Sequence, residues 1–346
     1  MPLIVLPLFS DIFNEGIWKE AAALEDQGLQ GLASRLQRFV LQARAPATTT
    51  MYYRAFKKWK DFAFSNLKMT SFLPISPIHV ALYLQHVLES TRSCSSVDTA
   101  FYAIKWAHEM AGMVSPTDNQ LVSRVREAAK RILGAARPNR KEPITIEVLN
   151  DMVGRADLSN ILQLRNVCLY ALSYAGFFRS EEVRNIRMNH IYFHEGYMLI
   201  KVEKSKTDQL RQGDEVVIAQ SGGRVCPVSL LKTYLSKLDI DPLSSEFIFR
   251  PLVKTKSSYK LVQKDKPISY TTFRDQLAKS LQNVVPDPSV YGTHSFRSGG
   301  ASRAANSGVS DRVFQRHGRW KSVAAKDGYV KDDVSSRLQV SKSLGL

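Results

Sequence analysis

Four residues in the C-terminal part of the chain have side chains and a spacing suited to attack on a phosphodiester. The segment GTHSFRSGGASRAANSGVSDRVFQRHGRWKSVAAKDGYV contains, in order, His294, Arg297, Trp320 and Tyr329. If this segment begins as a helix, His294 and Arg297 share one face, because residues three apart are neighbours on a helix. The glycines and serines that follow allow two further short elements to bring Trp320 and Tyr329 back toward that face. A phenol beside a guanidinium and an imidazole suits a tyrosine for attack on phosphorus.

Two cationic residues further upstream complete this set. Arg179 lies in AGFFRSEEV, just before a predicted helix that Ser180 is suited to cap, and Lys206 lies in the hairpin sequence KSKTDQ. Two arginines from different segments match the anionic oxygen pair of a phosphodiester and stabilise the charge that develops during transfer.

Each remaining side chain of the set has a chemical task for which it is suited. A tyrosine nucleophile loses a proton from a phenol whose ordinary pKa is about 10, and His294 is placed to accept that proton. A leaving 5′-oxygen needs a proton, which a lysine on a hairpin such as Lys206 is suited to deliver. Trp320 offers an apolar wall and an indole N–H donor.

The composition indicates a globular and strongly basic protein. Of the 346 residues, 44% are hydrophobic and 10% aromatic, which excludes a disordered chain and allows two domains of ordinary size. The 48 Lys and Arg against 32 Asp and Glu give a formal net charge of +16. This charge favours a protein that binds nucleic acid over a protein that is basic but has no nucleic-acid partner. The three cysteines match no zinc site and, being odd in number, argue against a disulfide framework.

The N-terminal segment MPLIVLPLFSDIF does not read as a membrane anchor. It is apolar for nine residues, lacks a basic n-region and is too short to span a bilayer. We therefore expect a soluble intracellular protein without membrane contact. With a nucleic-acid partner, it would work in the nucleus of a eukaryotic host and in the cytoplasm and nucleoid otherwise.

Hydrophobic periodicity predicts two domains that follow an N-terminal helical extension over 1–38. Four helices are expected within 39–134, with Ser76 capping the second and with Gly112 and Gly134 ending the third and fourth. A basic, proline-containing linker over 135–143 precedes the second domain. The basic residues of the first domain that we expect to contact DNA are Arg54, Lys57, Lys58, Lys105, Arg124, Arg126, Lys130 and Arg131.

The second domain, 144–346, is predicted to be mainly α-helical with one small sheet. A core helix near 161–174 ends at Gly176, a hairpin runs from GYMLIKVEKSK to DEVVIA, and another helix lies around 228–237. The C-terminal segments that contain the four residues above are predicted to be helical.

The ordered set resembles the tyrosine recombinase (phage integrase) superfamily, whose members share an Arg…Lys…His-x-x-Arg…His/Trp…Tyr active site. The resemblance covers about 46–346, and the spacing from Arg297 to Trp320 to Tyr329 agrees with the family. Around Arg179, Gly-x-x-Arg-x-x-Glu approximates the family's Gly-x-Arg-x-x-Glu. Trp320 is a family option where His is commoner, and His317 is three residues too early, so we interpret it as a surface or helix-end residue.

The sequence offers three candidates for the lysine of the set. Lys201, Lys204 and Lys206 compete for it, and we favour Lys206 because it precedes the turn-like TDQ and the following strand. The KSKTD and CPVSL stretches are similar to those of recombinases from eukaryotic mobile elements.

The resemblance implies a two-domain clamp, in which a helical core-binding domain and a catalytic domain close around double-stranded DNA. It implies that Tyr329 attacks DNA to give a 3′-phosphotyrosine and a free 5′-hydroxyl, without ATP, metal or other cofactor. It also implies a homo-tetramer on paired DNA sites. Two alternatives remain: a catalytically idle DNA-binding protein derived from such an enzyme, and a type IB topoisomerase. The compact helical domain favours the recombinase over the topoisomerase.

Overall fold

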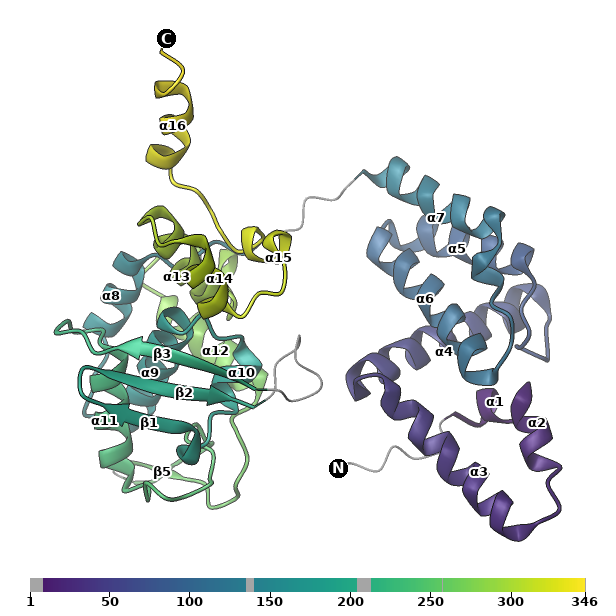
Figure 1. Cartoon of the computed structure of the whole chain (residues 1–346), viewed down its shortest axis with the longest axis horizontal. Coiled ribbons are helices and arrows are strands. Elements are labelled where there is room, and N and C mark those ends of the chain that lie inside the picture. Colours follow the sequence, from purple (N-terminus) through teal and green to yellow (C-terminus); the bar gives the residue numbers. More distant parts are fainter. Residues whose placement is uncertain (1–8, 135–139, 204–212, 257, 346) are drawn as a thin grey trace. The chain divides into compact units, whose positions relative to one another are not determined.

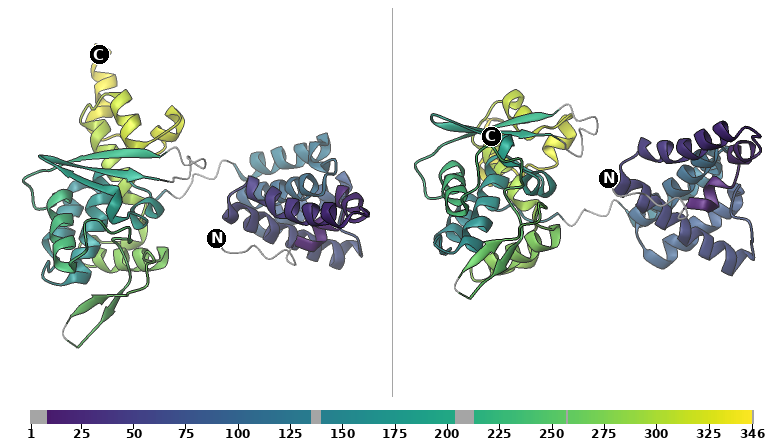
Figure 2. Two further views of the ribbon diagram at one scale, coloured as in Figure 1. Left: turned by 60° about the horizontal axis from the view of Figure 1, so that its bottom comes forward. Right: turned by 90° about the horizontal axis from the view of Figure 1, so that it is seen from below.

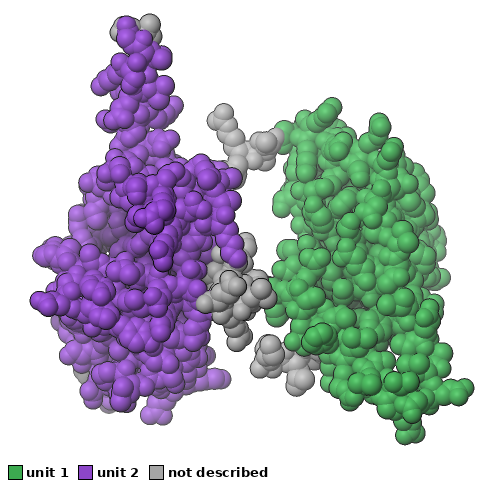
Figure 3. All heavy atoms as spheres, viewed as in Figure 1, with its two compact units in different colours: residues 1–138 green, residues 139–346 purple. Residues whose placement is uncertain are grey.

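The computed structural model of the chain describes residues 9–134, 140–203, 213–256 and 258–345. The chain divides into two compact units, residues 1–138 and 139–346 (Figure 3). Each unit has its own hydrophobic core. The predicted fold class, mainly α with a small β-sheet, is confirmed. In the described parts of the chain, no helix is both long and apolar enough to cross a membrane.

The described part of unit 1, residues 9–134, contains α-helices and two short 3-10 helices and no strand (Figure 1). In chain order these elements are α1 (Ser10–Phe13), α2 (Ile17–Ala22), α3 (Gln27–Val40), η2 (Leu41–Ala43), α4 (Pro46–Leu67), α5 (Pro77–Thr91), α6 (Cys94–Ala111), η3 (Pro116–Asp118) and α7 (Gln120–Leu133). Helices α4 to α7 are the four helices predicted from the periodicity.

Large aromatic side chains fill the core of unit 1. Phe56 and Trp59 on α4 have no exposed surface, and Trp106 on α6 is 2% exposed. Phe9 and Trp18, which precede the four long helices, belong to the same core, and the Trp18 indole donates a hydrogen bond to the Met110 carbonyl. The segment before α4 therefore contributes to the fold of unit 1.

Local sequence signals set the ends of the unit 1 helices. The Ser76 hydroxyl accepts a hydrogen bond from the His79 N–H at the start of α5, and Pro77 occupies the first helical position. Helix α6 ends at Gly112, whose φ of +67° is a conformation that glycine adopts without strain, and α7 ends at Gly134. These three predicted helix ends are confirmed.

Unit 2 combines helices with two small antiparallel sheets (Figure 1). Its helices are α8 (Ile146–Gly154), α9 (Ile161–Ala175), α10 (Ser180–Arg184), η4 (Met188–His190), α11 (Pro227–Leu238), α12 (Tyr270–Leu281), η5 (Pro288–Val290), α13 (Ser295–Asn306), α14 (Asp311–Gly318), α15 (Val323–Asp327) and α16 (Val334–Lys342). Its strands are β1 (Ile191–His194), β2 (Tyr197–Val202), β3 (Asp214–Ala219), β4 (Leu252–Lys254) and β5 (Tyr259–Leu261).

The larger sheet has the order β1-β2-β3, and Tyr197 at the start of β2 pairs with Ala219 at the end of β3. The predicted β2–β3 hairpin is confirmed, whereas β1 and the β4–β5 pair were not predicted. Alternate residues of β2, Met198 and Ile200 among them, are buried in the core that also contains α9 and α11, as the period of a strand requires. Figure 2 shows these helices on the same side of the sheet in two orientations.

Helix α13, which contains Arg297, packs unusually closely on its neighbours. A Cβ atom on Gly299 would lie 1.9 Å from the Ile144 carbonyl oxygen, and one on Gly300 would lie 2.2 Å from the Tyr174 carbonyl oxygen. The Ile144 N–H also donates a hydrogen bond of 2.9 Å to the Ser295 carbonyl. Two glycines therefore let α13 approach the backbone before α8 and at the end of α9.

We predict that Gly299→Ala lowers the free energy of unfolding by about 1–3 kcal/mol, because the added methyl group meets backbone that has no room to move. The loss should appear although alanine is the better helix former. Urea unfolding followed by fluorescence measures it. The matched control is Gly222→Ala, whose Cβ would meet nothing within 4 Å. Equal stability of the two variants would contradict this account of the packing.

Candidate active site

The centre of the candidate site is a buried carboxylate surrounded by three guanidinium groups. Glu182 on α10 is 7% exposed, and its Oε1 lies 2.6 Å from Nη1 of Arg179. Its Oε2 lies 2.8 Å from Nη2 of Arg319, which follows α14, and 4.0 Å from Nη1 of Arg297 on α13. One negative charge therefore links positive charges from three segments that are far apart in the sequence.

The turn between α9 and α10 places Arg179 and Glu182. Helix α9 ends at Gly176, as predicted, and Phe177 then adopts a φ of +46°. The Arg179 N–H donates a hydrogen bond of 2.9 Å to Glu182 Oε2 at the third position of α10. The prediction that Ser180 caps this helix is wrong. Arg179 is the N-cap residue, and Ser180 is the first helical residue. The Glu182 side chain accepts the hydrogen bond from the N–H of the N-cap residue.

Arg297 lies at the bottom of the site, with no exposed surface. Its Nη2 donates a hydrogen bond of 2.6 Å to the Gly318 carbonyl, and its Nη1 donates to the Phe177 carbonyl. Burial, together with the positive charges of Arg179 and Arg319, lowers the pKa of Arg297, and the Glu182 carboxylate opposes this effect. The cluster therefore holds more positive than negative charge away from water, a setting that favours an incoming anion.

The rings of Trp320 and Tyr329 lie against this guanidinium. The Cζ of Arg297 is 4.8 Å from the centroid of each ring, and the two centroids are 5.7 Å apart. Trp320 is buried and Tyr329 is half-buried. The structure thus brings together three of the predicted site residues through contacts between cation and aromatic face.

Short contacts hold Tyr329 beside α13 and α14. The buried Lys326 on α15 lies 2.8 Å from Asp311 Oδ2 at the start of α14. The Ser302 hydroxyl donates to the Tyr329 carbonyl at 3.4 Å and accepts from the Lys331 N–H at 2.9 Å. The segment around Tyr329 is therefore attached to α13 and α14, which carry or precede two of the three arginines of the cluster.

His294 is not part of the buried centre of the site. It is exposed and is the N-cap residue of α13, three residues before the buried Arg297. The helix itself begins at Ser295, one residue later than the helical stretch considered in the sequence.

Lys204 and Lys206 lie outside the described residues, so the structure does not place them. Lys201, the third lysine considered, lies in β2, and its Nζ is 4.9 Å from the Tyr192 ring centroid.

A basic hollow of about 440 Å³ adjoins Trp320. Its other lining residues are Asp214, Arg312, Gln315, Arg316, Arg319 and Lys321. Neither this hollow nor the ion pair between Arg319 and Glu182 was identified from the sequence. The basic residues before and after Trp320 were the signal in the sequence that indicated a positively charged surface here.

Arg319 and His317 attach the end of α14 to the end of α9. Arg319 donates to the carbonyls of Gly176 and Phe177, both at 3.1 Å. The Nε2 of His317 lies 2.8 Å from the Ala175 carbonyl, and burial lowers its pKa. His317 is in the last turn of α14, which confirms the helix-end alternative of the interpretation, and its side chain is partly buried.

Three buried N–H groups in this site have no hydrogen-bond partner among the described residues. They are Nε of Arg297, Nε of Arg319 and Nε1 of Trp320. Buried donors without acceptors are costly, so their presence in one cluster is a feature that requires an explanation. Among the described residues, no group of three or more His, Cys, Asp and Glu side chains is arranged to hold a metal ion.

The basic residues expected to contact DNA in unit 1 fall into two groups. On α4, Arg54, Lys57 and Lys58 are exposed and have no ion-pair partner among the described residues, and the same holds for Arg124 and Arg131 on α7. The other three, Lys105, Arg126 and Lys130, are in ion pairs. Lys105 lies 2.8 Å from Asp118. Arg126 and Lys130 share Asp98, at 2.5 Å and 3.8 Å.

The chain is similar to known integrases and recombinases. The sequence matches the phage integrase family over residues 144–335, which is more than half of the chain. An integrase/recombinase xerD homolog from Selenomonas ruminantium is 26% identical over 291 residues, covering 81% of this chain and 82% of the relative.

Solved structures with the same fold include two DNA complexes. The XerH site-specific recombinase bound to palindromic difH substrate matches with a TM-score of 0.61 and 14% identity, over 97% of this chain and 92% of the other. The Tn1549 transposon integrase in complex with transposon right end DNA matches with a TM-score of 0.59 and 13% identity, over 90% and 99% of the two chains.

The chain belongs to the phage integrase family, the tyrosine recombinases, which break and rejoin DNA. The resemblance seen in the sequence is confirmed, and with it the prediction of a site-specific recombinase or integrase.

We predict that Glu182→Gln destabilises unit 2 by about 3–5 kcal/mol at pH 7, because it leaves three guanidinium groups without a counter-charge. Burial raises the pKa of Glu182, but Arg319 and Arg179 outweigh it and hold that pKa below its ordinary value. A lowered folded-state pKa means that the stabilisation is complete above the unfolded value of about 4.3 and disappears as the pH falls through the folded value.

Urea unfolding of the wild type and of Glu182→Gln at pH 7 and near pH 3 tests this prediction. The difference between the two proteins should be largest at pH 7 and should decrease as the pH falls through the folded-state pKa of Glu182. Glu181→Gln is the matched control, since Glu181 is exposed in the same helical turn. A difference that is independent of pH would show that the carboxylate charge is not what stabilises the cluster.

Proposed function

We propose that Tyr329 cleaves one strand of duplex DNA within the cluster around Glu182. The Tyr329 oxygen attacks phosphorus, the bond from phosphorus to the 5′-oxygen breaks, and the products are a 3′-phosphotyrosine and a free 5′-hydroxyl. The observation that carries this proposal is that Arg297 and Trp320, each with an unpartnered buried donor, lie against the Tyr329 ring. Arg319, which has a third such donor, shares the Glu182 carboxylate with Arg297. A phosphate oxygen is the acceptor that such donors lack.

Each side chain of the set has one role in this proposal. Arg179 and Arg297 bind the non-bridging oxygens and stabilise the charge that develops on them. The exposed His294 accepts the phenol proton, and Lys206 gives a proton to the departing 5′-oxygen. Trp320 donates its indole N–H and closes the apolar side of the site. Rejoining is the same sequence in reverse, with a 5′-hydroxyl attacking the phosphotyrosine.

The burial of Arg297 adds a conformational step to this proposal. Because its guanidinium has no exposed surface and the Tyr329 ring lies 4.8 Å from it, a phosphate reaches Arg297 only after that ring has moved. Arg297 uses Nη1 and Nη2 for the Phe177 and Gly318 carbonyls, and three of its five N–H bonds remain. The same guanidinium therefore holds the fold together and still has donors for the phosphate.

DNA contacts are proposed for both units. In unit 1, the region 39–134 presents the exposed basic residues of α4 and α7 to phosphates, and 135–143 links it to the catalytic region 144–346. In unit 2, Arg312, Arg316 and Lys321 around the hollow beside Trp320 provide further phosphate contacts. Binding through several lysines and arginines should weaken steeply as the salt concentration rises.

The proposed assembly is a homo-tetramer on two paired DNA sites, since exchange of strands between duplexes requires four cleavages. The KSKTD and CPVSL stretches support an enzyme of a mobile element. In a eukaryotic host it would act in the nucleus, and otherwise in the cytoplasm and nucleoid.

A DNA-binding protein without cleavage activity is the second candidate. The observation that favours it is the complete burial of Arg297, both of whose terminal nitrogens donate to backbone carbonyls. Such a protein would bind duplex DNA without forming a covalent complex.

We predict that Tyr329→Phe binds DNA as the wild type does but forms no covalent adduct, because the ring that packs on Arg297 is kept and only the nucleophilic oxygen is lost. The measurement is trapping on nicked duplexes from the DNA flanking the gene, followed by a denaturing gel and peptide mapping, with EDTA present. Tyr270→Phe, at an exposed tyrosine of α12, should retain the adduct. An adduct in the Tyr329→Phe variant would place the nucleophile elsewhere. Relaxation of supercoiled DNA without recombinant product would indicate a topoisomerase.

We predict that Arg179→Lys and Arg297→Lys slow cleavage at saturating DNA by at least about 100-fold, while the dissociation constant for DNA changes much less. Lysine keeps the charge but loses the planar fork that contacts two oxygens. Arg54→Ala, at an exposed residue of α4, should show the opposite pattern, with weaker binding and an unchanged cleavage rate at saturation. Equal losses of binding and cleavage in the lysine variants would make these arginines simple phosphate contacts. Thermal unfolding of each variant checks that it is folded.

A further inference from the structure

Helix α3 presents a stripe of large apolar side chains to solvent. This 14-residue helix has no buried residue. Leu29, Leu32, Leu36 and Phe39 are 48%, 54%, 49% and 69% exposed, respectively. Their spacing of three, four and three residues places them on one face of the helix, in the pattern by which one helix packs into another.

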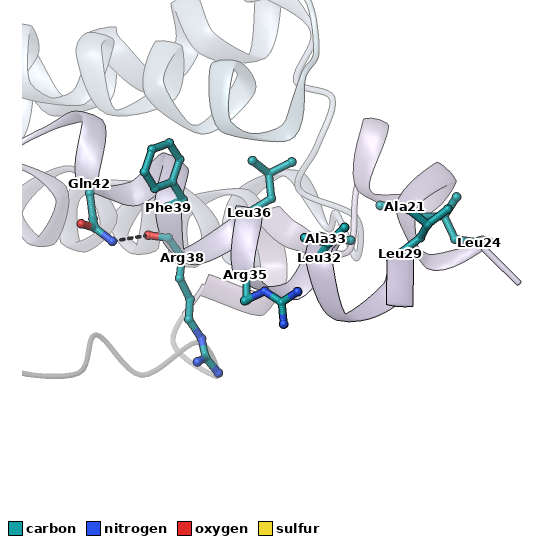
Figure 4. Close-up of a pocket in the computed structure, with 10 residues that line it drawn as sticks. All are labelled: Ala21, Leu24, Leu29, Leu32, Ala33, Arg35, Leu36, Arg38, Phe39 and Gln42. Atoms are coloured by element: carbon teal, nitrogen blue, oxygen red, sulfur yellow. Dashed lines mark hydrogen bonds between the residues drawn. The ribbon is translucent and has the colours of Figure 1, made fainter. Parts of the chain in front are cut away.

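The stripe is one side of a hollow of about 760 Å³ (Figure 4). Ala21 and Leu24, from α2 and the turn after it, extend the apolar lining beyond Leu29. Figure 4 shows Leu36 and Phe39 on one side of α3, with the side chains of Arg35 and Arg38 directed away from them. Contiguous apolar surface of this kind marks an interaction site, because water contact with it is unfavourable.

We propose that α3 is a self-association surface, through which two copies of this chain pair in antiparallel orientation without DNA. In such a pair, Leu29 of one copy packs against Phe39 of the other, and Leu32 packs against Leu36. This proposal is independent of the cleavage chemistry, because it uses only residues of unit 1.

The symmetry of the stripe and the charges beside it favour a second copy as the occupant. The spacing of three, four and three is the same when read from either end, so two antiparallel stripes match residue for residue. Glu25 and Asp26 precede the helix, whereas Arg35 and Arg38 lie in its C-terminal half. Antiparallel pairing brings the acidic end of each copy near the basic end of the other, and it also opposes the two helix dipoles.

The C-terminal helix α16 does not match this surface. Its exposed apolar residues, Val334, Leu338 and Val340, are separated by four and two residues and so form no single stripe. The apolar residues 2–8 of the same chain are the competing occupant of the stripe. Removal of residues 2–8 distinguishes this occupant from a second copy.

Sedimentation of the full-length chain without DNA, over a range of concentrations, is the first test. The wild type should show a reversible equilibrium between one and two copies. Leu32→Glu combined with Leu36→Glu should raise the dissociation constant at least about 30-fold, because both pairs at the centre of the interface would then bury charge. Since both side chains are exposed in the single chain, the variant should keep the thermal unfolding of the wild type.

The matched control is Ile78→Glu combined with Leu82→Glu on α5. These residues are 52% and 48% exposed and also four apart, but they lie outside the hollow. This variant should dimerise like the wild type. Equal loss in both double variants, or an unchanged dimer in the α3 variant, would overturn the proposal.

Disulfide cross-linking tests the orientation. A mixture of Leu29→Cys and Phe39→Cys copies should cross-link to a mixed dimer under mild oxidation, whereas either variant alone should cross-link far less. Efficient cross-linking of Leu29→Cys with itself would indicate parallel pairing and overturn the antiparallel arrangement. A wild type that stays a single copy at all concentrations, and that dimerises only after residues 2–8 are removed, would show that the chain covers its own α3.

Discussion

The structure of unit 2 depends on the ion cluster that Glu182 forms with Arg179, Arg297 and Arg319. Three positive charges in a region of low dielectric repel one another strongly, and one carboxylate together with backbone carbonyls must compensate them. That compensation is available only when the end of α9, the start of α10, α13 and the end of α14 meet. The interaction that assembles the fold therefore also assembles the site, and the surplus positive charge that it leaves suits a phosphate.

Within this cluster, the arginines and the tyrosine are held in different ways. Helix α13, with Arg297, is fixed by two glycines at which a methyl group would clash with backbone. Tyr329 is only half-buried, and a few contacts from Ser302 and Lys326 attach its segment. A rigid arginine cluster beside a less firmly held tyrosine is consistent with the proposed reaction, in which the tyrosine leaves the guanidinium before it attacks. The unpaired apolar stripe on α3 adds a means by which copies of such an enzyme would associate before they meet DNA.

Much of the fold was predictable because it follows from local rules. The helices of unit 1 have aromatic residues at helical spacing, and Ser76, Gly112 and Gly134 set ends that the structure confirms. The β2–β3 hairpin was also visible, since its strands alternate in character. Strands β1, β4 and β5 were missed because short strands have weak periodicity and are stabilised by their partners. The prediction of Ser180 as the N-cap residue was wrong. The N-cap residue is Arg179, and its N–H donates to Glu182, three residues later.

The sequence by itself determined the order and spacing of Arg179, His294, Arg297, Trp320 and Tyr329, and with them the family, because these are properties of the linear chain. Only the tertiary structure decided that Glu182 and Arg319 complete the cluster, that Arg297 is fully buried while His294 is exposed, and that α3 leaves its apolar stripe uncovered. Those facts depend on which segments meet in space. A charged or apolar residue has the same letter in the sequence whether its partner is water, another side chain or a buried carboxylate.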